Sequence, residues 1–202
     1  ALEAFHGREN PAAVAASWPH LSNSDRWLRH AARIAIESQP VEQWAAKVYS
    51  EPNTQARITA AVALARSAGK AASRKVQPGA ATLEKIREPL LASLLEMNAR
   101  RLPDSQLLGL CRAYALTFIR LGKPTPSERE QIISQLEPLM PSKNADVSTE
   151  LVRVLVYLHS PHVIEKTMKL IDERSAPDVP DWAELANRNT GYGGGILKML
   201  ND

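Results

Sequence analysis

Apolar residues recur at three- and four-residue spacing along most of the chain, which is the spacing of one face of an α-helix. In one stretch Leu28, Ala32, Ala35 and Ile36 share such a face. Proline, glycine, asparagine and serine separate the stretches and supply the turns between them. The pattern predicts an all-α chain with helices over residues 10–21, 25–38, 41–48, 54–68, 83–101, 105–121, 126–137, 147–159 and 161–171. The sequence pattern predicts no strand with alternating apolar and polar residues, so no sheet is expected.

One pattern occurs twice near the N-terminus, over residues 25–36 and 53–64. Asp25 corresponds to Asn53 and Arg29 to Arg57, at an offset of 28 residues. A fixed period of this size is typical of solenoids, in which each helix pair buries its apolar face against its neighbours. The sequence therefore predicts a single repeat domain over residues 1–202, a right-handed α-α superhelix of about four to five helix pairs. Because the chain opens abruptly on Ala1, we expect it to be part of a longer protein.

The length and composition agree with a helical domain. The chain has 202 residues, of which only 5% are aromatic. Its single cysteine, Cys111, leaves no partner for an internal disulfide or for a Cys-x-x-Cys metal or haem-attachment motif. Cys111 lies on an apolar helix face with Leu107 and Phe118, so we expect a buried thiol that packs as a small apolar side chain. No apolar run is long enough to span a bilayer.

Positive charge is concentrated in the N-terminal half. Residues 24–75 hold nine Lys and Arg against four Asp and Glu, although the whole chain carries only +3. Helical spacing makes Arg26, Arg29 and Arg33 a stripe. Such a stripe is either a solvated helix face or a surface for phosphates. Residues 70–82 lack an apolar period and are predicted to form a basic loop. The interaction candidates are Arg26, Arg29, Arg33, Arg57, Arg74, Lys75 and Tyr192.

Other motifs are weaker. Tyr192 lies in a glycine cluster, but a phosphate-binding loop needs a preceding strand, and none is predicted there. His159 and His162 are three residues apart, which gives two ligands where a closed zinc site needs four. No Ser-His-Asp or Cys-His arrangement is recognisable. We therefore predict no catalytic residue, no metal ligand and no cofactor in this chain.

The repeated Asp/Asn-xxx-Arg-xx-Ala-Ala pattern resembles HEAT-type repeats, over about two thirds of the chain. Further segments, among them Asp25-Arg-Trp-Leu-Arg-His-Ala-Ala-Arg33 and Pro40-Val-Glu-Gln-Trp44, are similar to a helical part of large bacterial secreted proteins. Those proteins carry a sugar-dehydrogenase-like propeller and a c-type haem domain elsewhere. The resemblance implies an extracytoplasmic, periplasmic setting and a spacer or docking role between redox domains. This chain has no Cys-x-x-Cys-His, so any haem would belong to another part of the parent protein.

Two functions remain open at this point. The first is a non-catalytic protein-interaction or scaffold module, whose partner is a neighbouring domain of the parent chain or another subunit. The alternative is a nucleic-acid-binding helical repeat that uses the basic stripe in residues 26–75. An enzyme domain of unknown type is a third and weaker option.

Overall fold

The computed structural model describes residues 1–71 and 80–173, and within these ranges the chain is helical and has no strand. The all-α prediction is therefore confirmed for the part of the chain that the structure describes. The α-helices are α1 (Ala13–Ser17), α2 (Arg26–Glu37), α3 (Ala45–Tyr49), α4 (Thr54–Ala71), α5 (Ala80–Leu95), α6 (Asp104–Leu121), α7 (Pro126–Leu136), α8 (Ala145–Tyr157) and α9 (Val163–Glu173). The short 3₁₀ turns are η1 (Leu2–Phe5), η2 (Trp18–Ser22), η3 (Val41–Gln43), η4 (Ala99–Arg101) and η5 (Glu137–Leu139).

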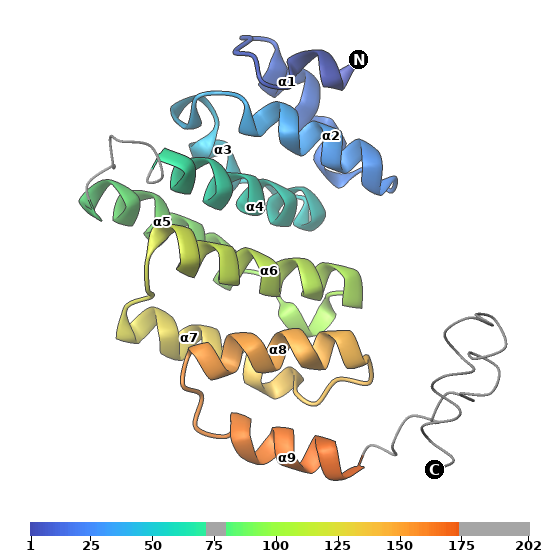
Figure 1. The fold of residues 1–202 in the computed structure, drawn as a ribbon, viewed down its shortest axis with the longest axis vertical. Helices are drawn as coiled ribbons and strands as arrows, with labels where there is room; N and C mark the ends of the chain where they lie inside the picture. The colour runs from blue at the N-terminus through green and yellow to red at the C-terminus, as the bar shows by residue number, and fades with distance from the viewer. Residues whose placement is uncertain (72–79, 174–202) are drawn as a thin grey trace, which may run out of the picture. The chain divides into compact units, whose positions relative to one another are not determined.

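Contacts divide the chain into two units, residues 1–167 and residues 168–202. In the first unit, successive helices form hairpins, and the even-numbered helices α2, α4, α6 and α8 contact one another in order. The odd-numbered helices α3, α5 and α7 likewise contact one another in order (Figure 1). The most extensive contact is between α4 and α6. In the second unit the structure describes only the last turns of α9, so one repeat domain over residues 1–202 stays a prediction.

One hydrophobic cluster runs through the first unit from Trp18 to Val163. Its largest fully buried side chains include Trp44, which directly precedes α3, and Tyr114 and Leu110, which lie on α6. Small residues in α4, from Ala60 to Ala65, are also buried, and they allow neighbouring helices to approach closely. The predicted burial of Cys111 is confirmed, because its side chain is 1% exposed.

Several helix limits differ from those predicted. The first predicted helix becomes α1 followed by η2, because Pro19 has no N–H for an α-helical hydrogen bond. The helix predicted over residues 83–101 instead forms α5 and the separate turn η4, with Pro89 inside α5. The predicted basic loop 70–82 is shorter than expected at both ends, since α4 reaches Ala71 and α5 starts at Ala80. The remainder of that loop lies outside the described residues.

Gly69 is a further difference. The sequence suggests a helix-ending glycine, but α4 continues past it to Ala71. A Cβ at Gly69 would lie 2.6 Å from the Cβ of Arg120 on α6. The glycine is therefore required by the close approach of α4 and α6, and its backbone does not end the helix.

Candidate interaction surface

The repeated arginines hold the turns of the fold. Arg29 donates to the carbonyl oxygens of Asn23 and of Ser24, the latter at 2.9 Å. Arg57 donates through Nε to the carbonyl of Glu51 at 2.6 Å. Each arginine thus binds the backbone six residues earlier, in the turn that precedes its own helix.

Arg57 also reaches the next hairpin. One of its terminal nitrogens donates to the carbonyl of Ser93 at 3.1 Å and lies 3.2 Å from a carboxylate oxygen of Glu96. Both acceptors belong to the end of α5 and the turn after it. The expectation that repeat arginines reach toward a neighbouring unit is met at this position. Because these donors are already engaged, Arg57 offers little to an external ligand.

Arg33 is committed to a buried ion-pair network. The carboxylate of Glu37, whose side chain is 2% exposed, pairs with Arg33 and accepts from Nε of Arg66 on α4 at 2.9 Å. Burial lowers the pKa of the Arg33 guanidinium below its ordinary value; Glu37 opposes this shift, and Arg66 and Arg112 add to it. The network joins α2 to α4.

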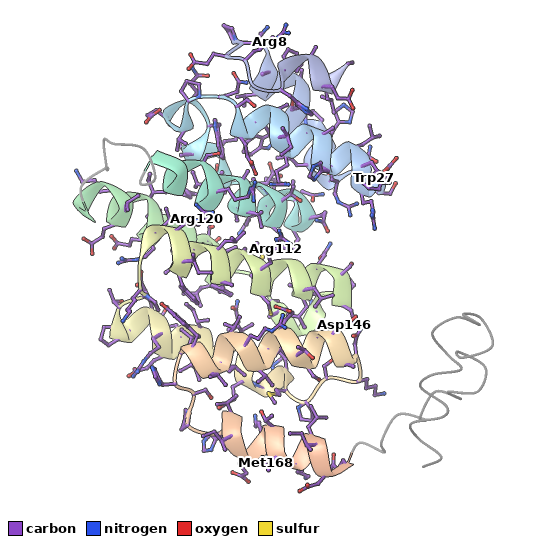
Figure 2. The ribbon with its side chains drawn as sticks, in the orientation of Figure 1. Arg8, Trp27, Arg112, Arg120, Asp146 and Met168 are labelled. Carbon is purple, nitrogen blue, oxygen red and sulfur yellow. The ribbon has the colours of Figure 1, made fainter. Side chains whose placement is uncertain are left out.

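Of the described candidates in the basic stripe, Arg26 alone is exposed, and its guanidinium lies 4.5 Å from the ring centre of Trp27. Trp27 is at the start of α2 (Figure 2). The structure therefore does not bring Arg26, Arg29, Arg33 and Arg57 together as one free cationic face. Arg74, Lys75 and Tyr192 lie outside the described residues.

A different surface emerges on α6 and α8, where apolar side chains predicted to be core are exposed. Ile119 is 73% exposed and Val156 is 52% exposed. The apolar spacing along α6 and α8 predicts that both side chains are buried. Both predictions are wrong, because α6 and α8 carry apolar residues on more of their circumference than their neighbours cover. Tyr157, also exposed, stacks on the buried Phe118 with ring centres 5.2 Å apart. This stack holds the phenol ring flat on the core.

Two hollows flank Tyr157, and we call them together the α6–α8 groove. The larger has a volume of about 460 Å³. Its lining residues are Lys123, Pro124, Pro126, Arg129, Val156, Tyr157, Leu158 and His159. The smaller has a volume of about 210 Å³. Its lining residues are Ala115, Phe118, Ile119, Glu150, Arg153, Val154 and Tyr157.

The basic groups of the larger hollow are Lys123, Arg129 and His159, and none of the described residues that line it carries a carboxylate. Nε of Arg129 is buried and makes no hydrogen bond within the described structure. A buried guanidinium N–H without an acceptor is costly. Nε has almost no surface open to a ligand, so an anion in the hollow would bind the other donors of the guanidinium. Apolar walls with cationic groups at one end would suit a ligand that is both apolar and acidic.

His159 shapes the end of the groove. It follows α8 with a positive φ of 54°, in the left-handed region. Its N–H donates to the carbonyl of Val156, and the N–H of Ser160 donates to the carbonyl of Leu155. These two bonds form a Schellman motif, which usually has glycine at the position of His159. The sequence pattern predicted a helix over residues 147–159 but not this turn, because a histidine is not a usual residue for a left-handed helix end.

Residues 1–71 and 80–173 contain no group of three or more His, Cys, Asp or Glu side chains placed to hold a metal ion. None of the helices in these ranges is both long enough and apolar enough to cross a membrane.

Comparison of the chain with protein families, with curated proteins and with solved structures finds no match in any of the three.

Proposed function

We propose that the chain is a non-catalytic protein-interaction module that binds a partner in the α6–α8 groove. The observation that carries this proposal is the exposure of Ile119, Val156 and Tyr157 around two adjoining hollows. Exposed apolar side chains that gather beside a concave surface are typical of protein-binding sites. An aromatic anchor held by stacking, as Tyr157 is by Phe118, loses little conformational entropy on binding.

The repeat architecture supports the same proposal. Hairpins that contact only their neighbours, as expected of a HEAT-like, armadillo-like right-handed superhelix, leave long surfaces free for partners. The resemblance to secreted multidomain proteins extends the proposal to a scaffold role. In that role the module would link or dock redox domains of an extracytoplasmic parent protein. The nucleic-acid alternative gains no support from the structure, since Arg29, Arg33 and Arg57 are engaged internally.

Selection from a peptide library tests the proposal. Random peptides displayed on phage would be panned against the full chain, and enriched peptides would be titrated against variants. Ile119→Asp should weaken binding at least tenfold, because it places a charge in the apolar floor. Ile164→Asp is the matched control, because Ile164 is also 73% exposed but belongs to α9 and lines neither hollow. Enriched peptides that bind both variants equally well would refute the proposal.

A further inference from the structure

The charges of the α6–α8 groove indicate which kind of protein segment fits it. Lys123 lies in the connection from α6 to α7, Arg129 on the first turns of α7, and His159 after α8. Three separate elements thus direct basic groups to one hollow. The planar guanidinium of an arginine presents several donors, and two of them can bind one carboxylate with parallel hydrogen bonds.

The acidic groups near this hollow are occupied elsewhere. Glu128 on α7 accepts from the N–H of Thr125 at 2.6 Å and so belongs to the helix cap. Glu150 lines the smaller hollow only, where it pairs with Arg153 at 2.5 Å. The larger hollow therefore has basic groups without a carboxylate, whereas the smaller hollow has the paired Glu150 and Arg153 among apolar side chains, and Tyr157 lines both.

We infer that the groove binds an acidic segment of a partner protein, with a bulky apolar side chain as its anchor. The anchor would pack on Tyr157 and Ile119 in the smaller hollow, and a following carboxylate would bind Arg129 and Lys123. This inference rests on the proposed function and adds the chemistry of the partner. Opposite charges would also speed association and make the affinity depend on salt.

The test uses two synthetic peptide pools with the same central tryptophan or leucine. One pool has aspartate and glutamate flanks, and the other has lysine flanks. The acidic pool should bind the full chain at least tenfold more tightly, and the difference should shrink at high salt. Lys123→Glu should remove most of this preference. Lys143→Glu should leave it, because Lys143 is an exposed lysine just before the opposite end of α8.

The outcomes separate the inference from the proposal beneath it. If both pools bound equally and Ile119→Asp still abolished binding, the acidic partner would be excluded while the interaction module stood. If neither pool bound through Ile119 or Tyr157, the inference and the proposed function would both be refuted. If the chain associated with itself and Ile119→Asp abolished this association, the groove would be assigned to a second copy of the chain. Competition by short single-stranded DNA, lost in Lys123→Glu, would assign it to nucleic acid, and either result would overturn the inference.

Discussion

At the residue scale, one position in the hairpins has the same role with different side chains. Arg29, Arg57 and Ser148 each lie four residues after a helix-capping Asp or Asn, and each donates to the carbonyl six residues earlier. For Ser148 this carbonyl belongs to Ser142, at 3.0 Å. The preceding cap residue, Asn144, accepts from the N–H of Asp146 as Asp25 accepts from that of Trp27. The position therefore fixes the turn before its helix.

Substitution of Arg57 tests this structural role. Arg57→Ala should lower the free energy of unfolding by about 2–3 kcal/mol, since it removes charge-assisted hydrogen bonds to the part-buried carbonyls of Glu51 and Ser93. Arg57→Lys should recover only part of this, because an ammonium cannot reproduce the planar fork. Chemical denaturation would measure both. Arg26→Ala is the control and should change stability by less than about 0.5 kcal/mol; an equal loss in both alanine variants would refute the assigned role.

Cys111 makes a prediction about pH. Burial, with a smaller effect of Glu150, raises the pKa of its thiol to about 12. Above about pH 9 the unfolded chain loses this proton while the folded chain keeps it, so stability falls by about 1.4 kcal/mol per pH unit. Urea unfolding near pH 8 and near pH 10 should show a steeper loss for wild type than for Cys111→Ala. Equal slopes would contradict burial of a protonated thiol.

At the element scale, the sequence predicted which segments are helical better than it predicted their ends. The expected helices have counterparts in the described ranges, since the apolar spacing marks them directly. The ends depend on contacts that spacing does not contain. Gly69 was read as a stop, and the approach of Arg120 explains it instead. His159 acts as the helix-ending residue of α8 without being glycine.

Gly69→Ala measures how closely α4 and α6 approach. Alanine is the better helix former by about 1 kcal/mol. The contact of 2.6 Å that the new Cβ would make with Cβ of Arg120 should outweigh this preference. The net free energy of unfolding of the variant should be lower by about 1–2 kcal/mol. In the background Arg120→Gly, which lacks this Cβ, Gly69→Ala should become neutral or stabilising. Additive effects in this double-mutant cycle would show that the two positions do not touch.

The end of α8 gives a prediction of the opposite sign. A left-handed backbone costs a non-glycine residue roughly 1–2 kcal/mol. Glycine avoids this cost, but its greater conformational entropy in the unfolded chain lowers stability by a somewhat smaller amount. His159→Gly should therefore raise the free energy of unfolding by about 0.5 kcal/mol. Thermal or urea unfolding would detect this, with His162→Gly as a control outside the turn. A loss of stability would mean that the imidazole makes a contact that the fold needs.

At the scale of the first unit, periodicity could not distinguish core from binding surface. Ile119 and Val156 continue the apolar stripes of α6 and α8, and nothing in their spacing separates them from Leu121 or Leu155, which are buried. Which apolar positions are covered depends on the next hairpin's placement, and this is a property of the assembled helices. The spacing of the basic stripe likewise did not show that Arg29, Arg33 and Arg57 bind acceptors within the fold, in the preceding turn, on their own helix or in the next hairpin.

The order of contacts in residues 1–167 predicts how this unit opens. In a repeat protein, stability is the sum of each hairpin's own stability and its interfaces with neighbours. The amides of α4 and α6, which pack most extensively on each other, should exchange hydrogen most slowly, and those of α1 fastest. Leu21→Ala, a fully buried site in η2, should cost about 2–5 kcal/mol and speed exchange in α1 and α2 more than in α8. Leu155→Ala in α8 should do the converse. Equal acceleration throughout the described residues would show a single cooperative unit and would contradict the predicted repeat architecture.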